Sequence, residues 1–81
     1  MSDHNDYTPI DCGLYSEYEL LIMRRRRLRM HWRDEDGHDH METVRPTDLQ
    51  TRNSQEFMYA VTDDGSERCI RLDHIIKIEP L

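Results

Sequence analysis

The sequence predicts an α+β fold that is mostly β, with an N-terminal helix packed on a small, five-stranded and partly open β-barrel. Apolar residues recur with a helical period only between residues 14 and 25, and beyond residue 27 they alternate with polar residues as in half-buried strands. Two Asp-Gly pairs, at residues 36–37 and 64–65, lie between alternating segments and favour tight hairpin turns. These observations predict one helix, two hairpins and a last strand.

The helix is expected from about residue 14 to residue 25. Leu14, Tyr18, Leu21 and Ile22 recur at i, i+4, i+7 and i+8, which places them on one apolar face. Most neighbouring side chains then point away from the core.

A second start of the helix is compatible with the sequence. Ser16 could cap a helix that begins one turn later, with Glu19 three residues on as its capping-box partner. With either start, Tyr15, Glu17 and Glu19 fall mostly off the apolar face.

Five short strands are expected after the helix. In the first, Leu28, Met30 and Trp32 alternate with basic residues, which predicts a half-buried strand with a basic outer face. Short, strongly bent strands behind a helix favour a small barrel of the Sm-like or SH3-like kind. The five segments are residues 27–33, 40–45, 56–62, 68–72 and 75–78.

We expect Pro46 to end the second strand, because proline cannot donate a hydrogen bond to a ladder. Residues 47–49 are then expected to form a turn or a short 3₁₀ segment. Phe57 and Tyr59 share one face of the third strand, and together with Trp32 they are expected in the core.

Length and charge restrict the possible functions. The chain has 81 residues and a formal net charge of −6, and residues 1–23 contain no Lys or Arg. We expect residues 1–6 to be a flexible tail and residues 7–81 a single domain with one modest core. Because an acidic surface repels phosphates, we expect no direct nucleic-acid binding and favour a basic partner, or the nucleic-acid-binding groove of a partner.

The sequence also indicates a compartment. No apolar run approaches the roughly 18 residues that a membrane span needs, and the acidic N-terminus lacks the apolar segment of a secretory signal. We therefore expect a cytoplasmic protein without a membrane partner. Cys12 and Cys69 are then expected to be reduced, partly buried thiols, with a disulfide or redox switch as the alternative.

Enzymatic activity is not expected. His31 and His74 have no nucleophile in a recognisable arrangement, and the chain has neither a phosphate-binding loop nor a nucleophile elbow. We expect no catalytic residue and no cofactor.

A metal site is the other chemical possibility. His38 and His40 alternate beside Asp36 and Asp39, so that their imidazoles could converge on one side of a strand. The position is a hairpin turn without an assured third ligand, and we therefore expect no metal site.

The arginine run between Arg24 and Arg29 offers an alternative function. Such a run could contact phosphates, as in an Sm-like protein that binds RNA. Acidic residues on both sides can neutralise it, so we favour a helix C-terminus followed by the solvated face of a strand.

A set of short motifs spread over residues 7–78 resembles the Rof family, which are bacterial inhibitors of the transcription terminator Rho. The opening Y-x-P-I-x-C and the closing R-L-D-x-I are together fairly distinctive. The residues concerned are Tyr7-x-Pro9-Ile10-x-Cys12-x-x-Tyr15, Glu19-Leu20, Asp48-Leu49, Arg52, Glu56-Phe57-Met58 and Arg71-Leu72-Asp73-x-Ile75.

The resemblance implies a helix on an Sm-like barrel and a role in antitermination. Members of the family bind the hexameric RNA helicase Rho at its N-terminal OB-fold RNA-binding domain and block loading of the nascent RNA. Their helix and the segment before it carry much of the contact. We expect the free protein to be a monomer. Carried onto this chain, the partner-binding residues are Asp11, Tyr15, Ser16, Glu17 and Glu19.

Overall fold

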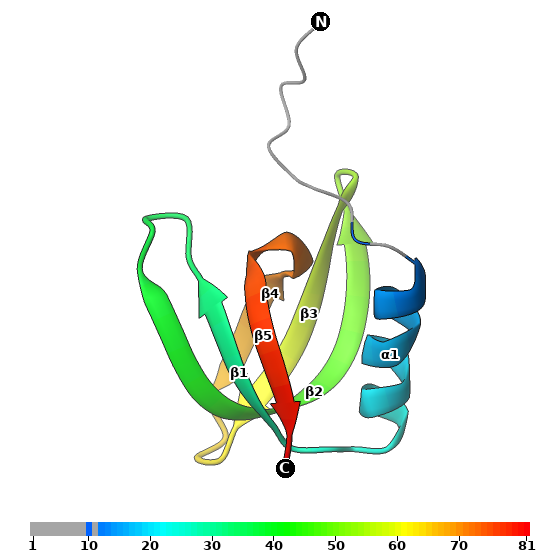
Figure 1. Ribbon diagram of the computed structural model, residues 1–81, viewed down its shortest axis with the longest axis vertical. Helices are drawn as coiled ribbons and strands as arrows, with labels where there is room; N and C mark the ends of the chain where they lie inside the picture. The colour runs from blue at the N-terminus through cyan, green and yellow to red at the C-terminus, as the bar shows by residue number, and fades with distance from the viewer. Residues whose placement is uncertain (1–9, 11) are drawn as a thin grey trace, which may run out of the picture.

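The computed structural model describes Ile10 and residues 12–81, and shows one helix followed by five strands (Figure 1). The strands form one antiparallel sheet in the order β4-β3-β2-β1-β5. Since β4 and β5 are its two edges, the barrel is partly open, and the predicted fold class is confirmed. The predicted tail, residues 1–6, lies outside the described residues. The elements are α1 (Cys12–Met23), β1 (Leu28–Arg33), β2 (Asp39–Arg52), β3 (Gln55–Thr62), β4 (Glu67–Arg71), the 3₁₀ segment η1 (Leu72–His74) and β5 (Ile75–Pro80).

The core draws side chains from the helix and from four of the strands. On β1 the predicted alternation is confirmed, because Leu28, Met30 and Trp32 are buried while Arg29 and Arg33 are exposed. The buried apolar residues are Tyr18, Leu28, Met30, Trp32, Val44, Met58, Ala60, Ile70 and Leu72.

Strand β2 continues through Pro46, so the predicted end of the strand there is wrong. Two features of the sheet accommodate the proline. The ladder between β1 and β2 stops at Leu28 opposite Val44, so that beyond this point β2 pairs with β3 alone among the described strands. The ladder with β3 also shifts register between Pro46 and Asp48, as at a β-bulge. From the bulge onward β2 curves up beside α1 (Figure 1).

The face of β3 that meets the core is also opposite to the prediction. Met58 and Ala60 are buried, whereas Phe57 and Tyr59 are only half-buried on the other face. There the Arg52 guanidinium lies 4.6 Å from the centroid of the Phe57 ring. Because apolar residues occupy both alternating sets of this strand, a shift of one residue exchanges its two faces.

Three tight turns connect the strands. Gly37 and Gly65 have positive φ angles of 84° and 89°, as the predicted Asp-Gly turns require. The β2–β3 turn was not predicted. Its central residues, Asn53 and Ser54, both have positive φ (51° and 63°), as in a type I′ turn, although serine is a poor substitute for the usual glycine.

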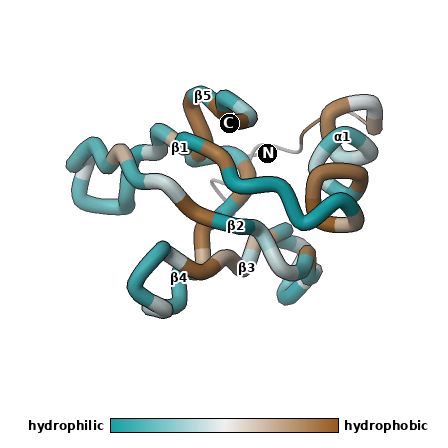
Figure 2. The backbone as a smooth tube through the Cα atoms, turned by 90° about the horizontal axis from the view of Figure 1, so that it is seen from below, coloured by the Kyte–Doolittle hydropathy of each residue, from teal (hydrophilic) through white to brown (hydrophobic). Residues whose placement is uncertain are grey.

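Helix α1 begins earlier than either predicted start, so Ser16 lies within the helix and does not cap it. Its C-terminus closes with hydrogen bonds from the Arg25 amide to the Ile22 carbonyl and from the Arg26 amide to the Leu21 carbonyl, and Arg25 has a φ of 54°. This is a Schellman motif with arginine where glycine is usual. Figure 2 shows the helix at one side of the sheet, joined to β1 by a strongly hydrophilic connection.

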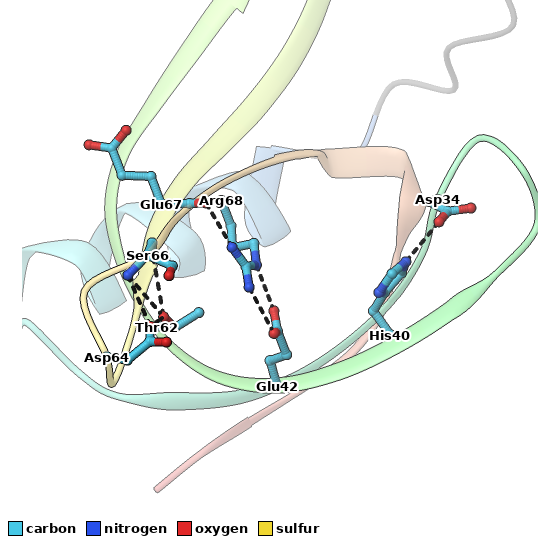
Figure 3. Close-up of polar contacts among 8 residues, drawn as sticks. All are labelled: Asp34, His40, Glu42, Thr62, Asp64, Ser66, Glu67 and Arg68. Carbon is cyan, nitrogen blue, oxygen red and sulfur yellow. Dashed lines mark hydrogen bonds and ion pairs between the residues drawn. The ribbon is translucent and has the colours of Figure 1, made fainter.

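Two ion pairs hold the β4 side of the sheet in place. The Arg68 guanidinium of β4 makes two contacts with the Glu42 carboxylate of β2, at 2.9 and 3.1 Å, although these strands are not neighbours (Figure 3). The Arg71 side chain donates to the Asp73 carboxylate at 2.6 and 3.0 Å, and both side chains are more than nine-tenths buried. The closing R-L-D motif thus has a structural explanation. None of the helices in the described part of the chain has the length and apolar character needed to cross a membrane.

Candidate functional site

The structure brings the charges of three acidic residues to bear on Tyr15, on the helix that packs beside β2. Tyr15 is half-buried and packs against the core, which its position in the helical pattern did not predict. Its pKa is raised above the ordinary value, first by burial and then by the negative charges of Glu56, Glu19 and Asp48. We call these four residues the Tyr15 corner. At this corner an aromatic ring lies within the electrostatic reach of three carboxylates.

Only part of the predicted set meets at this corner. Tyr15 and Glu19 are one helical turn apart and share a face of α1. Glu17 lies on another side of the helix, where its charge acts on Tyr18 and contributes to raising the pKa of that residue after burial. Ser16 is exposed, and Asp11 lies outside the described residues.

The hollow beside Glu17 is distinct from the corner. It has a volume of about 410 Å³ and lies between α1 and the edge strand β5. Apolar side chains of both elements line it, among them Leu14, Leu21 and Ile78, together with Lys77. Glu17 therefore faces a mixed apolar and basic environment.

Asp48 and Glu56 are the members of the corner that were not predicted as site residues. Asp48 is exposed and follows the β-bulge, where its carboxylate accepts hydrogen bonds from the Leu49 amide and the Gln50 side chain. Both acidic residues stand in motifs that carry the resemblance, which was the available signal. Their proximity to Tyr15 depends on the continuation of β2 past Pro46, and that continuation was not predicted.

The arginine run lies in and after the connection from α1 to β1, and part of it contributes to the fold. The Arg26 side chain donates to the Leu81 carbonyl oxygen at 2.8 Å. Arg27 forms a two-contact ion pair with Asp63, with a shortest distance of 2.8 Å. Arg24 and Arg29 are exposed and form no ion pair with any described residue. The run is thus not a continuous free basic surface.

The β1–β2 turn brings the Asp34 carboxylate close to two imidazoles, and Figure 3 shows its contact with one of them, His40. The Asp34 Oδ2 atom lies 2.7 Å from His40 Nε2 and 3.9 Å from His38 Nδ1. The hydrogen bond with His40, followed by that from the His38 amide, lowers the pKa of Asp34 to about 2. His40 also stacks on Trp32, with ring centroids 5.1 Å apart. Asp34 was not among the candidate metal ligands predicted from the sequence.

Both cysteines are free and exposed, so the prediction that they are partly buried is wrong. Cys69 lies on the outer face of β4, where an Arg52 nitrogen is 3.5 Å from its sulfur. Cys12 is the first residue of α1.

Comparison with known proteins finds a similar fold and does not identify a function. No model of a known protein family matches the sequence, and no curated protein matches it. Among solved structures, the chain is similar to part of proteasome accessory factor B/C (PafBC) of Arthrobacter aurescens, with a TM-score of 0.74 and 19% sequence identity. The match covers 93% of this chain and 12% of that chain. At this identity the similarity shows a shared fold alone.

Proposed function

We propose that this protein inhibits Rho-dependent transcription termination by binding the N-terminal OB-fold RNA-binding domain of Rho. The Tyr15 corner is the observation that carries the proposal. It supplies an aromatic ring beside the carboxylates of Glu19, Asp48 and Glu56. The resemblance of the motifs to the Rof family identifies the partner that this chemistry would suit.

The mechanism is competition with RNA, both steric and electrostatic. An OB-fold that grips single-stranded RNA combines a positive groove with stacking aromatic residues. The carboxylates of the corner would meet the Lys and Arg side chains that otherwise hold phosphates, and Tyr15 would pack against the groove. Charge complementarity of this kind raises the association rate and the specificity above all. The protein would act in the cytoplasm by occupying the site, without catalysis.

An RNA-binding function has less support. Arg26 and Arg27 are held by the C-terminal carbonyl and by Asp63, which leaves a small number of arginines for phosphates. The formal net charge of −6 also opposes binding to a polyanion.

The geometry of α1 provides a matched pair of variants to test the proposal. Glu17 and Glu19 are both exposed on the same helix, but only Glu19 lies at the Tyr15 corner. We expect Glu19→Lys to raise the concentration needed for half-inhibition of Rho-dependent termination in vitro at least about tenfold, because a like charge placed against a basic groove costs several kcal/mol. Glu17→Lys should have a clearly smaller effect.

The control experiments distinguish an error in the proposed binding site from an error in the proposed function. Circular dichroism and thermal unfolding should show both lysine variants folded, because exposed substitutions change stability by about 0.5 kcal/mol or less. The double variant Arg24→Ala, Arg29→Ala should inhibit as the wild type does. If Glu19→Lys inhibits at the wild-type concentration, the corner is not the binding site. If the wild type itself leaves termination unchanged, the proposed function is wrong.

A further inference from the structure

We propose that the β1–β2 turn binds a divalent transition-metal ion such as Zn²⁺ through Asp34, His38 and His40. This inference is independent of whether the chain binds Rho. It is carried by the approach of two imidazoles, those of His38 and His40, to one oxygen atom of the Asp34 carboxylate, and Figure 3 shows the contact with His40.

The distances suit a small metal ion. Tetrahedral Zn²⁺ with bonds of about 2.0–2.1 Å places its ligand atoms roughly 3.3 Å from one another. Asp34 Oδ2 lies 2.7 Å from His40 Nε2 and 3.9 Å from His38 Nδ1, on either side of that separation. The ligand atoms of Asp34, Asp36 and His38 all lie within 4.8 Å of one another, and His40 joins this group through its contact with Asp34, so that Asp36 is available as a further ligand. Since Asp34 and His40 are already in contact, a rotation of the exposed His38 side chain is what would complete the set.

The ligands are also held in place by the surrounding structure. The Asp34 Oδ1 atom accepts hydrogen bonds from the amides of Asp36 and His38, both at 2.9 Å, which leaves Oδ2 directed at the imidazoles. The His40 ring stacks on Trp32 with an interplanar angle of 13°. Contacts of this kind orient the ligands of metal sites. The side chain of His38 is 75% exposed, so an ion can reach the site from solvent.

The charge of the turn favours a cation. Residues 33–40 contain four carboxylates and one arginine, and the side chain of that arginine, Arg33, is paired with Asp39 at 2.7 Å. Nitrogen and oxygen ligands of this composition match zinc and neighbouring divalent metals, while two imidazoles disfavour Ca²⁺ and Mg²⁺.

The β3–β4 turn is an internal comparison for this site. Its backbone closes in the same way, with an amide-to-carbonyl bond of 2.9 Å from Thr62 to Ser66 that corresponds to the 2.9 Å bond from Asp34 to His38. Ser66 and Arg68 occupy the places of His38 and His40, and the Asp64 carboxylate accepts hydrogen bonds from Thr62 and Ser66 within the turn. An acidic turn of the same shape therefore lacks the imidazoles that would make it a metal site.

Trp32 provides the signal for the test. It is the only tryptophan of the chain and stacks on a proposed ligand, so a paramagnetic ion such as Ni²⁺ or Co²⁺ at the site should quench its fluorescence. Titration of the full chain at neutral pH should show saturable quenching, with calorimetry giving one ion per chain, and Zn²⁺ should restore the fluorescence by competition.

Variants test whether Zn²⁺ binds at the β1–β2 turn or at histidines elsewhere in the chain. His38→Ala and Asp34→Asn should each weaken Zn²⁺ binding by at least the 10–100-fold that loss of an outer-shell partner costs. Because His38 is exposed, its loss should leave the fold intact, as circular dichroism would verify. Two control variants should bind Zn²⁺ as the wild type does. His31→Gln changes a histidine outside the proposed ligand set, and Asp64→Asn changes an aspartate of the β3–β4 turn. The proposal is overturned if binding does not saturate at millimolar Zn²⁺, or if His38→Ala and Asp34→Asn bind as tightly as the wild type.

Discussion

Helix α1 and the arginine run that follows it use their charges in opposite ways. Arg26 and Arg27 contact the Leu81 carbonyl and Asp63, so a part of the basic charge holds the chain together. Glu17 and Glu19 are exposed and form no ion pair with any residue in the described part of the chain. The basic groups therefore contribute to the fold, while the acidic groups of the helix remain available to a partner.

The contrast extends across the molecule. Three arginines elsewhere are paired with carboxylates in the same way, most deeply in the ion pair between Arg71 and Asp73. A net charge of −6, with four of the arginines paired to carboxylates, leaves an excess of negative charge, and Tyr15 lies where three of the carboxylates act together. The distribution of paired and unpaired charge, more than the number of charges, indicates the class of partner.

The largest effect is expected from breaking the deepest arginine contact. Asp73→Ala would remove a carboxylate that contacts the buried Arg71 guanidinium twice, and breaking a buried ion pair typically costs about 3–5 kcal/mol. Urea unfolding would measure the loss, and in a domain of this size much of the total stability could be removed. Asp63→Ala removes the exposed partner of Arg27 and should cost about 1 kcal/mol or less. Equal losses in the two variants would contradict the distinction between them.

A smaller effect is expected at the centre of the acidic region. Tyr15→Ala removes the ring from the corner and should weaken binding to Rho at least about tenfold, because buried aromatic anchors carry much of the energy of an interface. Tyr15→Phe keeps the ring and should bind within about threefold of the wild type, since the ring accounts for most of the contact. Binding is measured by fluorescence anisotropy, with thermal unfolding as the test of folding. Wild-type affinity in a folded Tyr15→Ala protein would remove the corner from the interface.

The smallest effect tests whether the arginine run is free of a binding role. Arg25 has a φ of 54°, a conformation that costs non-glycine residues about 1–2 kcal/mol. Arg25→Gly relieves that cost and loses about 0.5–1 kcal/mol through the greater freedom of the unfolded chain, so we expect a gain of about 0.5 kcal/mol. Arg24→Gly, at a neighbouring position without a positive φ, should give no gain. Both variants should inhibit Rho as the wild type does.

Much of the fold could be predicted from the sequence because periodicity is a local property. The alternation of Leu28, Met30 and Trp32 and the two Asp-Gly turns were sufficient for the β1–β2 and β3–β4 hairpins. The long β2 strand could not be predicted, because the place of Pro46 depends on where the ladder with β1 stops. Whether a proline lies in a part of a strand that is paired on both sides therefore depends on residues far from it in the sequence.

The candidate site was predicted in part for the same reason. Tyr15 and Glu19 could be found from the helix and the resemblance, but Asp48 and Glu56 join them only after β2 bends back beside α1. Residues such as Phe57 that have apolar neighbours on both faces of a strand do not fix their own orientation. Sequence periodicity therefore identifies elements better than it identifies the residues that meet between them.

One measurement tests the proposed function most directly: a titration of the labelled protein against purified Rho, with and without competing oligo(C), beside a titration against RNA alone. We predict binding to Rho that oligo(C) displaces and that weakens as salt rises, because exposed charges are screened beyond about 10 Å at 0.1 M salt. We predict no binding to RNA alone. Binding to RNA together with no binding to Rho would contradict the account and favour the alternative function, RNA binding through the arginine run.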